Sequence, residues 1–195
     1  MKNRDGSGNS NGSGGSGGDR ADAPKRIAIL TTGGTIAKTY NEADGTLGNQ
    51  MCVLDLMLAS LVLRGVVVDR VPVMNKDSLD MTEADHLHIA KIVVAYSGTH
   101  DGVVIVHGTD RLAETGERVL KETGEGLSVP IILTGAMRPY ELRTTDALQN
   151  LTEALLAVQL LEPGIYCVMH NRVLRFPGVE KDYGRMTFVN RDGDS

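Results

Sequence analysis

Five short apolar runs, separated by longer segments with helical spacing, restrict the fold more than any other feature of this sequence. The runs cover residues 26–30, 66–73, 102–108, 129–135 and 164–170. Their nearly continuous Val, Ile and Leu content is typical of strands that are covered on both faces. The helical segments lie at 51–63, 82–97, 111–123 and 144–161. This alternation predicts a doubly wound α/β fold, with a mainly parallel sheet and flanking helices.

The sequence at residues 82–97 also indicates where this predicted helix begins. Thr82 is a suitable N-cap, and Asp85, three residues later, can complete a capping box. Residues 171–189 lack a clear period and contain Phe-Pro-Gly, so we expect a hairpin excursion there.

The two ends of the chain differ in composition from the part between them. Residues 1–24 consist largely of Gly, Ser and Asn and contain almost nothing that can be buried. Such a segment cannot offset the entropy lost on ordering. We therefore expect a flexible tail over 1–24, a single domain over 25–190 and a loose end over 191–195.

Charge and composition exclude two classes of main partner. The formal net charge is −5, whereas nucleic acids and anionic membranes bind basic faces. No apolar run approaches the roughly 18 residues that span a bilayer, and no apolar signal segment is found. Cys52 and Cys167 lack metal-binding spacing and are expected to be buried or semi-buried reduced thiols. These features predict a cytoplasmic protein with no nucleic-acid or membrane partner.

Glycine and hydroxyl residues follow three of the predicted strands. TTGGTIA occupies 31–37, HGTD occupies 107–110, and TGAMRP occupies 134–139. Taken singly, Gly-Gly is usually a turn and Thr-Asp usually an N-cap, and the spacing matches neither the dinucleotide nor the Walker pattern. In a doubly wound sheet, however, ligands bind at the carboxyl ends of the strands. The three segments are therefore expected to converge on one crevice.

The same strings resemble the L-asparaginase/glutaminase family, since TTGGTIA is followed about 70 residues later by HGTD and then by LTGAMRP. The resemblance covers about residues 26–189. DSLDM at 77–81 resembles the substrate loop of the family, and VMHNRVLRFPGVEKD resembles the segment that carries its catalytic lysine. The resemblance implies that residues 25–190 form the N-terminal catalytic domain of the family, in a compact, short-chain type without the second domain.

Catalytic roles follow from this resemblance. Thr35 corresponds to the nucleophile, which attacks a side-chain amide and forms an acyl-enzyme. Thr109, Asp110 and Lys181 correspond to the second threonine, the aspartate and the lysine of the polar triad. Tyr40 corresponds to the tyrosine of the mobile lid loop.

Substrate-binding positions follow in the same way. Ser78 corresponds to a residue that binds the α-carboxylate of the substrate, and Asp110 also to the one that binds its α-ammonium. Ala136 lies where a backbone group meets the amide. Backbone N–H groups near Gly34 and Gly108 are candidates for holding the oxyanion, and Asp77 completes the expected set.

The residue types make chemical sense without the resemblance. A threonine hydroxyl is a weak nucleophile and needs an activating neighbour. A lysine with an ordinary pKa of about 10.4 is a poor base at neutral pH, and a carboxylate such as Asp110 favours its charged form. We therefore expect Lys181 to polarise and orient the hydroxyls at least as much as it removes a proton. The chemistry calls for no metal and no cofactor.

The function that the resemblance implies is hydrolysis of L-asparagine to L-aspartate and ammonia, by a homodimer or homotetramer. Two alternatives stay open. One is a glutaminase or the amidase component of a tRNA-dependent amidotransferase, and the other is a non-catalytic module that binds amino acids. In long family members the second domain supplies an acidic residue for the substrate ammonium, so a short-chain type would depend on Asp110 and other groups.

His86 and His88 form a pair that resembles a metal site. On a helix, residues i and i+2 do not face the same side. We therefore expect solvent-exposed histidines here instead of shared ligands, and a structural role for His107 at the end of its strand.

Overall fold

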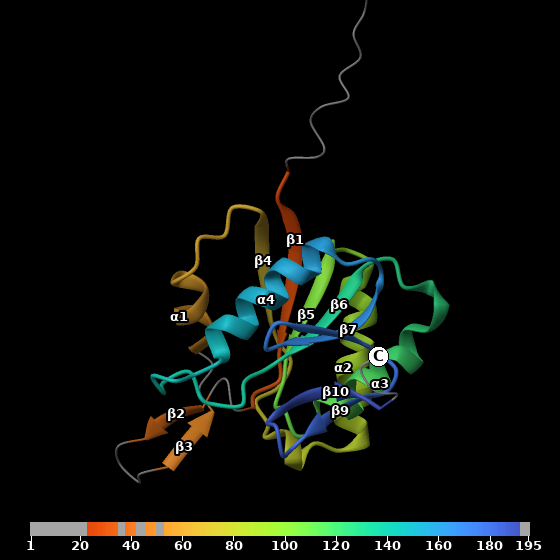
Figure 1. The fold of residues 1–195 in the computed structure, drawn as a ribbon. Coiled ribbons are helices and arrows are strands. Elements are labelled where there is room, and N and C mark those ends of the chain that lie inside the picture. Colours follow the sequence, from red (N-terminus) through yellow and green to blue (C-terminus); the bar gives the residue numbers. More distant parts are fainter. Residues whose placement is uncertain (1–22, 35–37, 42–45, 50–52, 192–195) are drawn as a thin grey trace, which may run out of the picture.

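The computed structural model describes residues 23–34, 38–41, 46–49 and 53–191 (Figure 1). Its main sheet has the strand order β4-β1-β5-β6-β7-β8. The first five strands in that order are parallel, and β8 runs antiparallel to β7. The strands are β1 (Lys25–Thr31), β4 (Val66–Pro72), β5 (Gly102–Val106), β6 (Pro130–Thr134), β7 (Gly164–Met169) and β8 (Arg172–Arg175). The predicted mainly parallel α/β fold is confirmed. The predicted terminal tails lie almost wholly outside the described residues.

Helices cover both faces of the sheet, which explains why its strands are apolar on both sides. Ile27 and Ile29 pack in one buried cluster with α1 and α4, and Ala28 and Leu30 pack in another with α2 and α3. Figure 1 shows α4 crossing the near face of the sheet. The helices are α1 (Val53–Ala59), α2 (Glu83–Ser97), α3 (Leu112–Thr123) and α4 (Ala147–Leu160). In the described part of the chain, none of them is long and apolar enough to cross a membrane.

The start of α2 has the capping box that the sequence predicts. The Thr82 side chain accepts a hydrogen bond from the backbone N–H of Asp85, and the Asp85 carboxylate accepts one from the backbone N–H of Thr82. Lys76 Nζ also donates to this carboxylate over 2.7 Å. These hydrogen bonds fix the segment that joins β4 to α2 at the point where α2 begins.

Helix α1 is shorter than the segment of 51–63 that the sequence suggests, because it ends at Ala59. The hydroxyl of Ser60 donates to the carbonyl of Met57 over 2.6 Å, a local bond that competes with continuation of the helix. Leu61 and Leu63 still pack against the core, from a non-helical segment that leads into β4.

The irregular region 171–189 contains the expected hairpin, formed by β9 (Val179–Asp182) and β10 (Thr187–Asn190). Lys181 pairs with Phe188 in this hairpin. A second hairpin, β2 (Lys38–Asn41) with β3 (Thr46–Asn49), was not predicted, and Tyr40 pairs there with Leu47. Figure 1 shows both hairpins near the end of the sheet where the parallel strands finish.

The winding of the chain reverses at β1. The chain passes from β1 to β4 on one side and afterwards returns to place β5 on the other side. The carboxyl ends of β1 and β5 therefore flank the crevice in which open α/β sheets bind ligands.

Phe176 anchors the chain between β8 and β9 to helix α3. Its side chain is only 4% exposed, and it lies against Gly116 so closely that a Cβ on this glycine would be 2.1 Å from the ring atom Cζ. The absence of a side chain at Gly116 is what lets this segment, and the Lys181 strand that follows it, approach the helix.

Gly116→Ala is expected to lower the free energy of unfolding by about 1–3 kcal/mol, because the enclosed Phe176 ring cannot move away without strain. This loss should outweigh the gain of about 1 kcal/mol in helix propensity. Urea denaturation measures it. Gly126→Ala is a suitable control, since a Cβ there meets no atom of the described residues within 4 Å. Equal stability of the two variants would contradict the packing described.

Candidate functional site

Three segments meet in close contact beyond the ends of β1, β4 and β5. A Cβ on Gly34 would lie 2.4 Å from the Cα of Gly108, and one on Gly108 would lie 2.6 Å from Oγ of Ser78. Gly34 also has a φ of +87°, a conformation that favours glycine. No larger residue fits at Gly34 or Gly108 without moving the neighbouring segment. The contact between Gly34 and Gly108 joins two of the three segments that the sequence predicts to converge on one crevice.

Lys181 joins this crevice from the β9–β10 hairpin. Its Nζ donates to Oγ1 of Thr109 over 2.8 Å and to Oδ1 of Asp110 over 2.7 Å, across separations of 72 and 71 residues. The Lys181 side chain is 8% exposed and that of Asp110 is 28% exposed. The ring of Tyr183 covers the ammonium, with its centroid 4.9 Å from Nζ. A charged donor is therefore held against a buried hydroxyl.

The turn after β6 borders Thr109 on another side. A Cβ on Gly135 would lie 2.3 Å from the carbonyl oxygen of His107 and 3.4 Å from Cγ2 of Thr109. Ala136, which follows, is fully buried. The backbone of this turn is thus close enough to Thr109 to contribute to one pocket with it.

Asp146 fixes the shape of the same turn. Its carboxylate accepts hydrogen bonds of 2.9 Å from the backbone N–H groups of Met137 and Arg138, and it also bonds to Asn150 and His170. Burial alone would raise the pKa of Asp146, but these hydrogen bonds outweigh it and hold the pKa below its usual range. The sequence gives little sign of this group, since an aspartate before a helix is ordinarily read as a cap.

The substrate-loop residues are ordered by a local bond. The Asp77 carboxylate accepts a 3.1 Å hydrogen bond from the backbone N–H of Leu79, which caps the short 3₁₀ helix η2 (Ser78–Asp80). Ser78 is 1% exposed and faces Gly108. This arrangement brings the Ser78 hydroxyl to the crevice.

The structure brings together most of the residues that the sequence singles out. Thr109, Asp110 and Lys181 are hydrogen bonded, and Gly34, Gly108 and Ser78 are in contact. Thr35 lies outside the described residues. For Tyr40 only the backbone in β2 is described. Over the ranges that the structure covers, no group of three or more His, Cys, Asp or Glu residues could hold a metal ion.

One expectation about the histidines is wrong. His88 is exposed, but His86 is 2% exposed and packs toward α3. Its Nδ1 lies 2.7 Å from Oγ1 of Thr115 on that helix. The two histidines do face different sides of α2, as the spacing requires, but one of these sides is covered.

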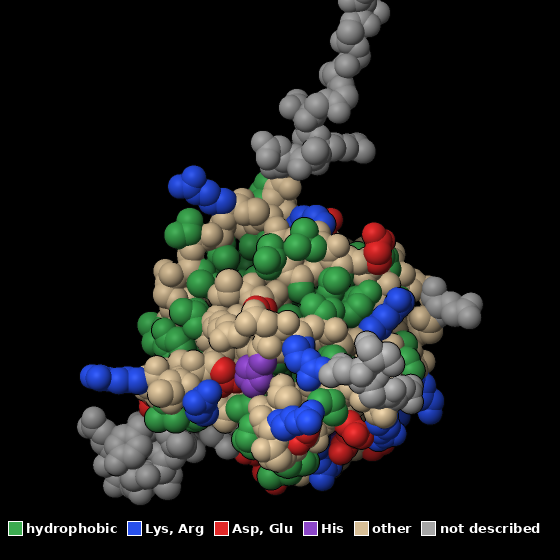
Figure 2. Space-filling view, in the orientation of Figure 1, with side chains coloured by type: hydrophobic (Ala, Val, Ile, Leu, Met, Phe, Trp, Pro, Cys, Tyr) green, Lys and Arg blue, Asp and Glu red, His purple; other side chains and the backbone are tan. Residues whose placement is uncertain are grey.

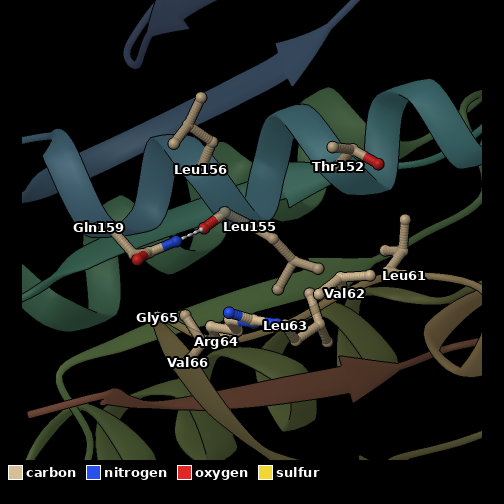
Figure 3. Close-up of a pocket in the computed structure, with 10 residues that line it drawn as sticks. All are labelled: Leu61, Val62, Leu63, Arg64, Gly65, Val66, Thr152, Leu155, Leu156 and Gln159. Atoms are coloured by element: carbon tan, nitrogen blue, oxygen red, sulfur yellow. Dashed lines mark hydrogen bonds between the residues drawn. The ribbon is translucent and has the colours of Figure 1, made fainter.

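Several cavities are lined by residues outside the bonded triad, and two of them are larger than the others described. One of about 520 Å³ adjoins the turn after β6 and is lined by Met137, Arg138, His170, Arg185 and Met186. The other, of about 320 Å³, lies between residues 61–66 and α4 (Figure 3). It is near the amino end of β4, and Arg64 is the only charged residue among those that line it. The second cavity therefore offers little for catalysis.

Known proteins share this sequence pattern and this fold. A family model described as "Asparaginase, N-terminal" matches residues 26–184. The L-asparaginase of Thermococcus kodakarensis is 30% identical over 160 residues, which are 80% of this chain and 47% of that protein. A glutamyl-tRNA(Gln) amidotransferase polypeptide of Thermoplasma acidophilum is 29% identical over 137 residues, 70% of this chain and 33% of that protein.

Among solved structures, the thermostable L-asparaginase from Thermococcus kodakarensis aligns with a TM-score of 0.76 at 29% identity. The alignment covers 85% of this chain and 51% of that one. The present chain thus spans about half, or less, of the length of these relatives.

His107, beside the site, should make folding depend on pH. Burial lowers the pKa of His107 from 6.5 to about 4. As the pH falls from 6.5 to 4, the unfolded chain binds a proton that the folded chain does not, so the free energy of unfolding should decrease. The loss attributable to this group is on the order of 3 kcal/mol.

Urea denaturation at several pH values measures this dependence. His107→Gln should reduce this dependence between pH 6.5 and 4, because the buried imidazole at position 107 is no longer there to titrate. His88→Gln, which changes an exposed histidine, should leave the slope as in the parent. A parent-like slope in His107→Gln would show that His107 is not buried in its neutral form.

Proposed function

The chain belongs to the asparaginase family, and from this membership we propose that it hydrolyses L-asparagine to L-aspartate and ammonia through a threonine nucleophile. The observation that carries the proposal is the pair of hydrogen bonds from Lys181 Nζ to Thr109 and Asp110. They join residues that are distant in sequence into one largely enclosed polar group at the carboxyl ends of the strands. The proposed catalytic domain comprises residues 25–190, which include all three members of this group.

In the proposed reaction, Oγ1 of Thr35 attacks the side-chain amide carbon and loses its proton. The C–O bond forms as the carbonyl becomes an oxyanion, and the C–N bond then breaks as the nitrogen takes up a proton and leaves as ammonia. Water attacks the resulting ester, which releases L-aspartate and returns the proton to Thr35. Every residue is regenerated, and no atom is oxidised or reduced. The reaction therefore requires no redox partner.

Lys181 and Thr109 act in this scheme as a polarising and proton-transferring pair. Because Lys181 donates to Oγ1 of Thr109, the hydroxyl proton of Thr109 must point to another acceptor. It is then available to the reacting groups, while Asp110 balances the charge of the ammonium. Lys181 therefore orients the hydroxyl and need not be a neutral base.

The proposed substrate contacts use the groups around this pair. Ser78 binds the α-carboxylate, and Asp110, whose Oδ1 is bonded to Lys181, offers its Oδ2 to the α-ammonium. Asp77 holds the Ser78 loop, and Tyr40 closes over the nucleophile. Backbone groups at Gly34, Gly108 and Ala136 line the amide and oxyanion positions. Such donors contribute about 3–4 kcal/mol each to transition-state stabilisation.

A glutaminase, or the amidase component of a tRNA-dependent amidotransferase, is the second candidate. The similarity to a glutamyl-tRNA(Gln) amidotransferase polypeptide favours it, because the same nucleophile would release ammonia from a related amide. Rates on L-asparagine and L-glutamine, measured side by side, separate the two. A module that only binds amino acids would bind either one without releasing ammonia.

We also propose a cytoplasmic homodimer or homotetramer. Apolar side chains gather on the face of the molecule over α4 (Figure 2), where Leu156 and Leu160 are 57% and 71% exposed. Exposed apolar patches of this kind are common at protein interfaces. Light scattering determines the assembly.

Lys181→Met and Thr109→Val should each reduce the rate of ammonia release from L-asparagine by about a hundredfold or more. The first removes the ammonium that polarises Thr109, and the second removes the hydroxyl itself. Thr35→Ala should abolish the covalent route. A coupled ammonia assay measures all three.

Lys121→Met, which changes an exposed lysine on α3, is the matched control and should behave like the parent. Circular dichroism establishes that each variant is folded. An ordinary rate in Lys181→Met or Thr109→Val would show that the triad is misassigned. An ordinary rate in Thr35→Ala would eliminate the nucleophile assignment.

A further inference from the structure

Three buried side chains form a continuous series behind the site. Nδ1 of His86 lies 2.7 Å from Oγ1 of Thr115, and this oxygen lies 2.8 Å from Nε2 of His107. Nδ1 of His107 lies 2.7 Å from the carbonyl oxygen of Gly108. The three side chains are 2%, 0% and 0% exposed, respectively. The series thus runs from α2 through α3 to the residue that precedes Thr109.

One carbonyl identifies the direction of all these hydrogen bonds. The oxygen of Gly108 can only accept, so Nδ1 of His107 must carry a proton. A neutral His107 then has a bare Nε2, which accepts the hydroxyl proton of Thr115. The Thr115 oxygen accepts in turn from Nδ1–H of His86. Each group therefore has one assigned role.

The surroundings keep both rings in the form that this direction requires. Burial lowers the pKa of His107 to about 4, and it also lowers the pKa of His86, although the charge of Glu114 opposes this. Within the described part of the chain, Nε2 of His86 has no hydrogen-bond partner, and it lies 3.6 Å from the Glu114 carboxylate. A proton taken up there would leave Nδ1–H of His86 in place, so the rest of the series would keep its direction.

The series acts on the site through a single peptide group. A trans peptide is planar, with its C=O and N–H pointing in opposite directions. When His107 holds the Gly108 carbonyl on the interior side, the N–H of Thr109 must point to the other side. Among the backbone–backbone hydrogen bonds of the described residues, none is donated by this N–H. The same peptide leads directly to the Cα of Thr109 and so determines where its side chain begins. Lys181 contacts this side chain.

We propose that His86, Thr115 and His107 form a positioning network that fixes the tautomer of His107 and thereby the orientation of the Gly108–Thr109 peptide in the active site. None of the three touches the reacting atoms, so they are positioning residues. The effect on catalysis rests on the proposed function, whereas the tautomer and the bond direction do not.

The tautomer is tested first, without any assay of activity. In long-range ¹H–¹⁵N correlation spectra of the labelled protein at pH 7, His107 should have a protonated Nδ1 and a bare, hydrogen-bonded Nε2. In Thr115→Val the Nε2 resonance should move toward the value of a nitrogen without a donor. A His107 protonated at Nε2 in the parent protein would overturn the network.

Kinetic measurements test the effect of the network on the site. Thr115→Val, which keeps the shape and removes the hydroxyl, should lower kcat by about tenfold to a hundredfold with a smaller change in KM, because a misoriented catalytic group costs turnover. Thr115→Ser restores a hydroxyl at this position and should recover most of the rate. Thr123→Val is the control on the same helix, since among the described residues the Thr123 hydroxyl bonds only to helix carbonyls.

The outcomes separate the two proposals. A folded Thr115→Val with the kcat of the parent would refute the positioning role, and so would a loss of rate that Thr115→Ser shares in full. If the parent releases no ammonia, the proposed hydrolysis fails, while the spectra still decide whether the network exists. Thermal unfolding of each variant identifies a loss of rate that comes only from lost structure.

Discussion

The ammonium of Lys181, bonded to Thr109 and Asp110, is the contact on which the rest of the site depends. A lysine that is almost completely enclosed is costly unless a carboxylate and further acceptors compensate for its lost hydration. Asp110 provides the carboxylate and Thr109 the neutral acceptor. The β9–β10 hairpin is therefore tied to the segment after β5 by polar bonds as well as by its apolar contacts. Removing either end of the Lys181–Asp110 pair would leave a charge without a partner.

The sheet explains why these groups can meet. The chain winds in opposite directions from β1, so the segments after β1 and β5 lie side by side. Gly34 and Gly108 let their backbones touch, which leaves space at the strand ends for Ser78 and Thr109. Beneath this contact, His107 holds the Gly108 carbonyl, and Asp146 holds the turn that carries Ala136. The polar crevice is thus supported from below by hydrogen bonds of His107, just after β5, and of Asp146, just before α4.

Most of the architecture, but only part of the site, could be predicted from the sequence. Apolar runs and the Thr82–Asp85 capping box are local signals, so the strands and the start of α2 were recognised. The strings around Thr109 and Lys181 were found through a family resemblance, and their contact is a matter of tertiary structure. The burial of His86 was missed because periodicity does not reveal which neighbour covers a helix face.

The Asp146 group and the β2–β3 hairpin were missed for related reasons. An aspartate next to a helix start looks like a cap, but most of its partners here come from two other segments. Short strands such as Lys38–Asn41 have too few residues for a clear period. Where partners are far apart in the chain, only the folded arrangement identifies them.

A crystal structure of this chain with bound L-aspartate, the proposed product, would test the central claim most directly. The account predicts that the side-chain carboxylate of the ligand lies within hydrogen-bond distance of Thr109 Oγ1, while Lys181 keeps its bonds to Thr109 and Asp110. The α-carboxylate should meet Ser78. Aspartate bound elsewhere, or a Lys181 turned away from Thr109 in the occupied site, would contradict it.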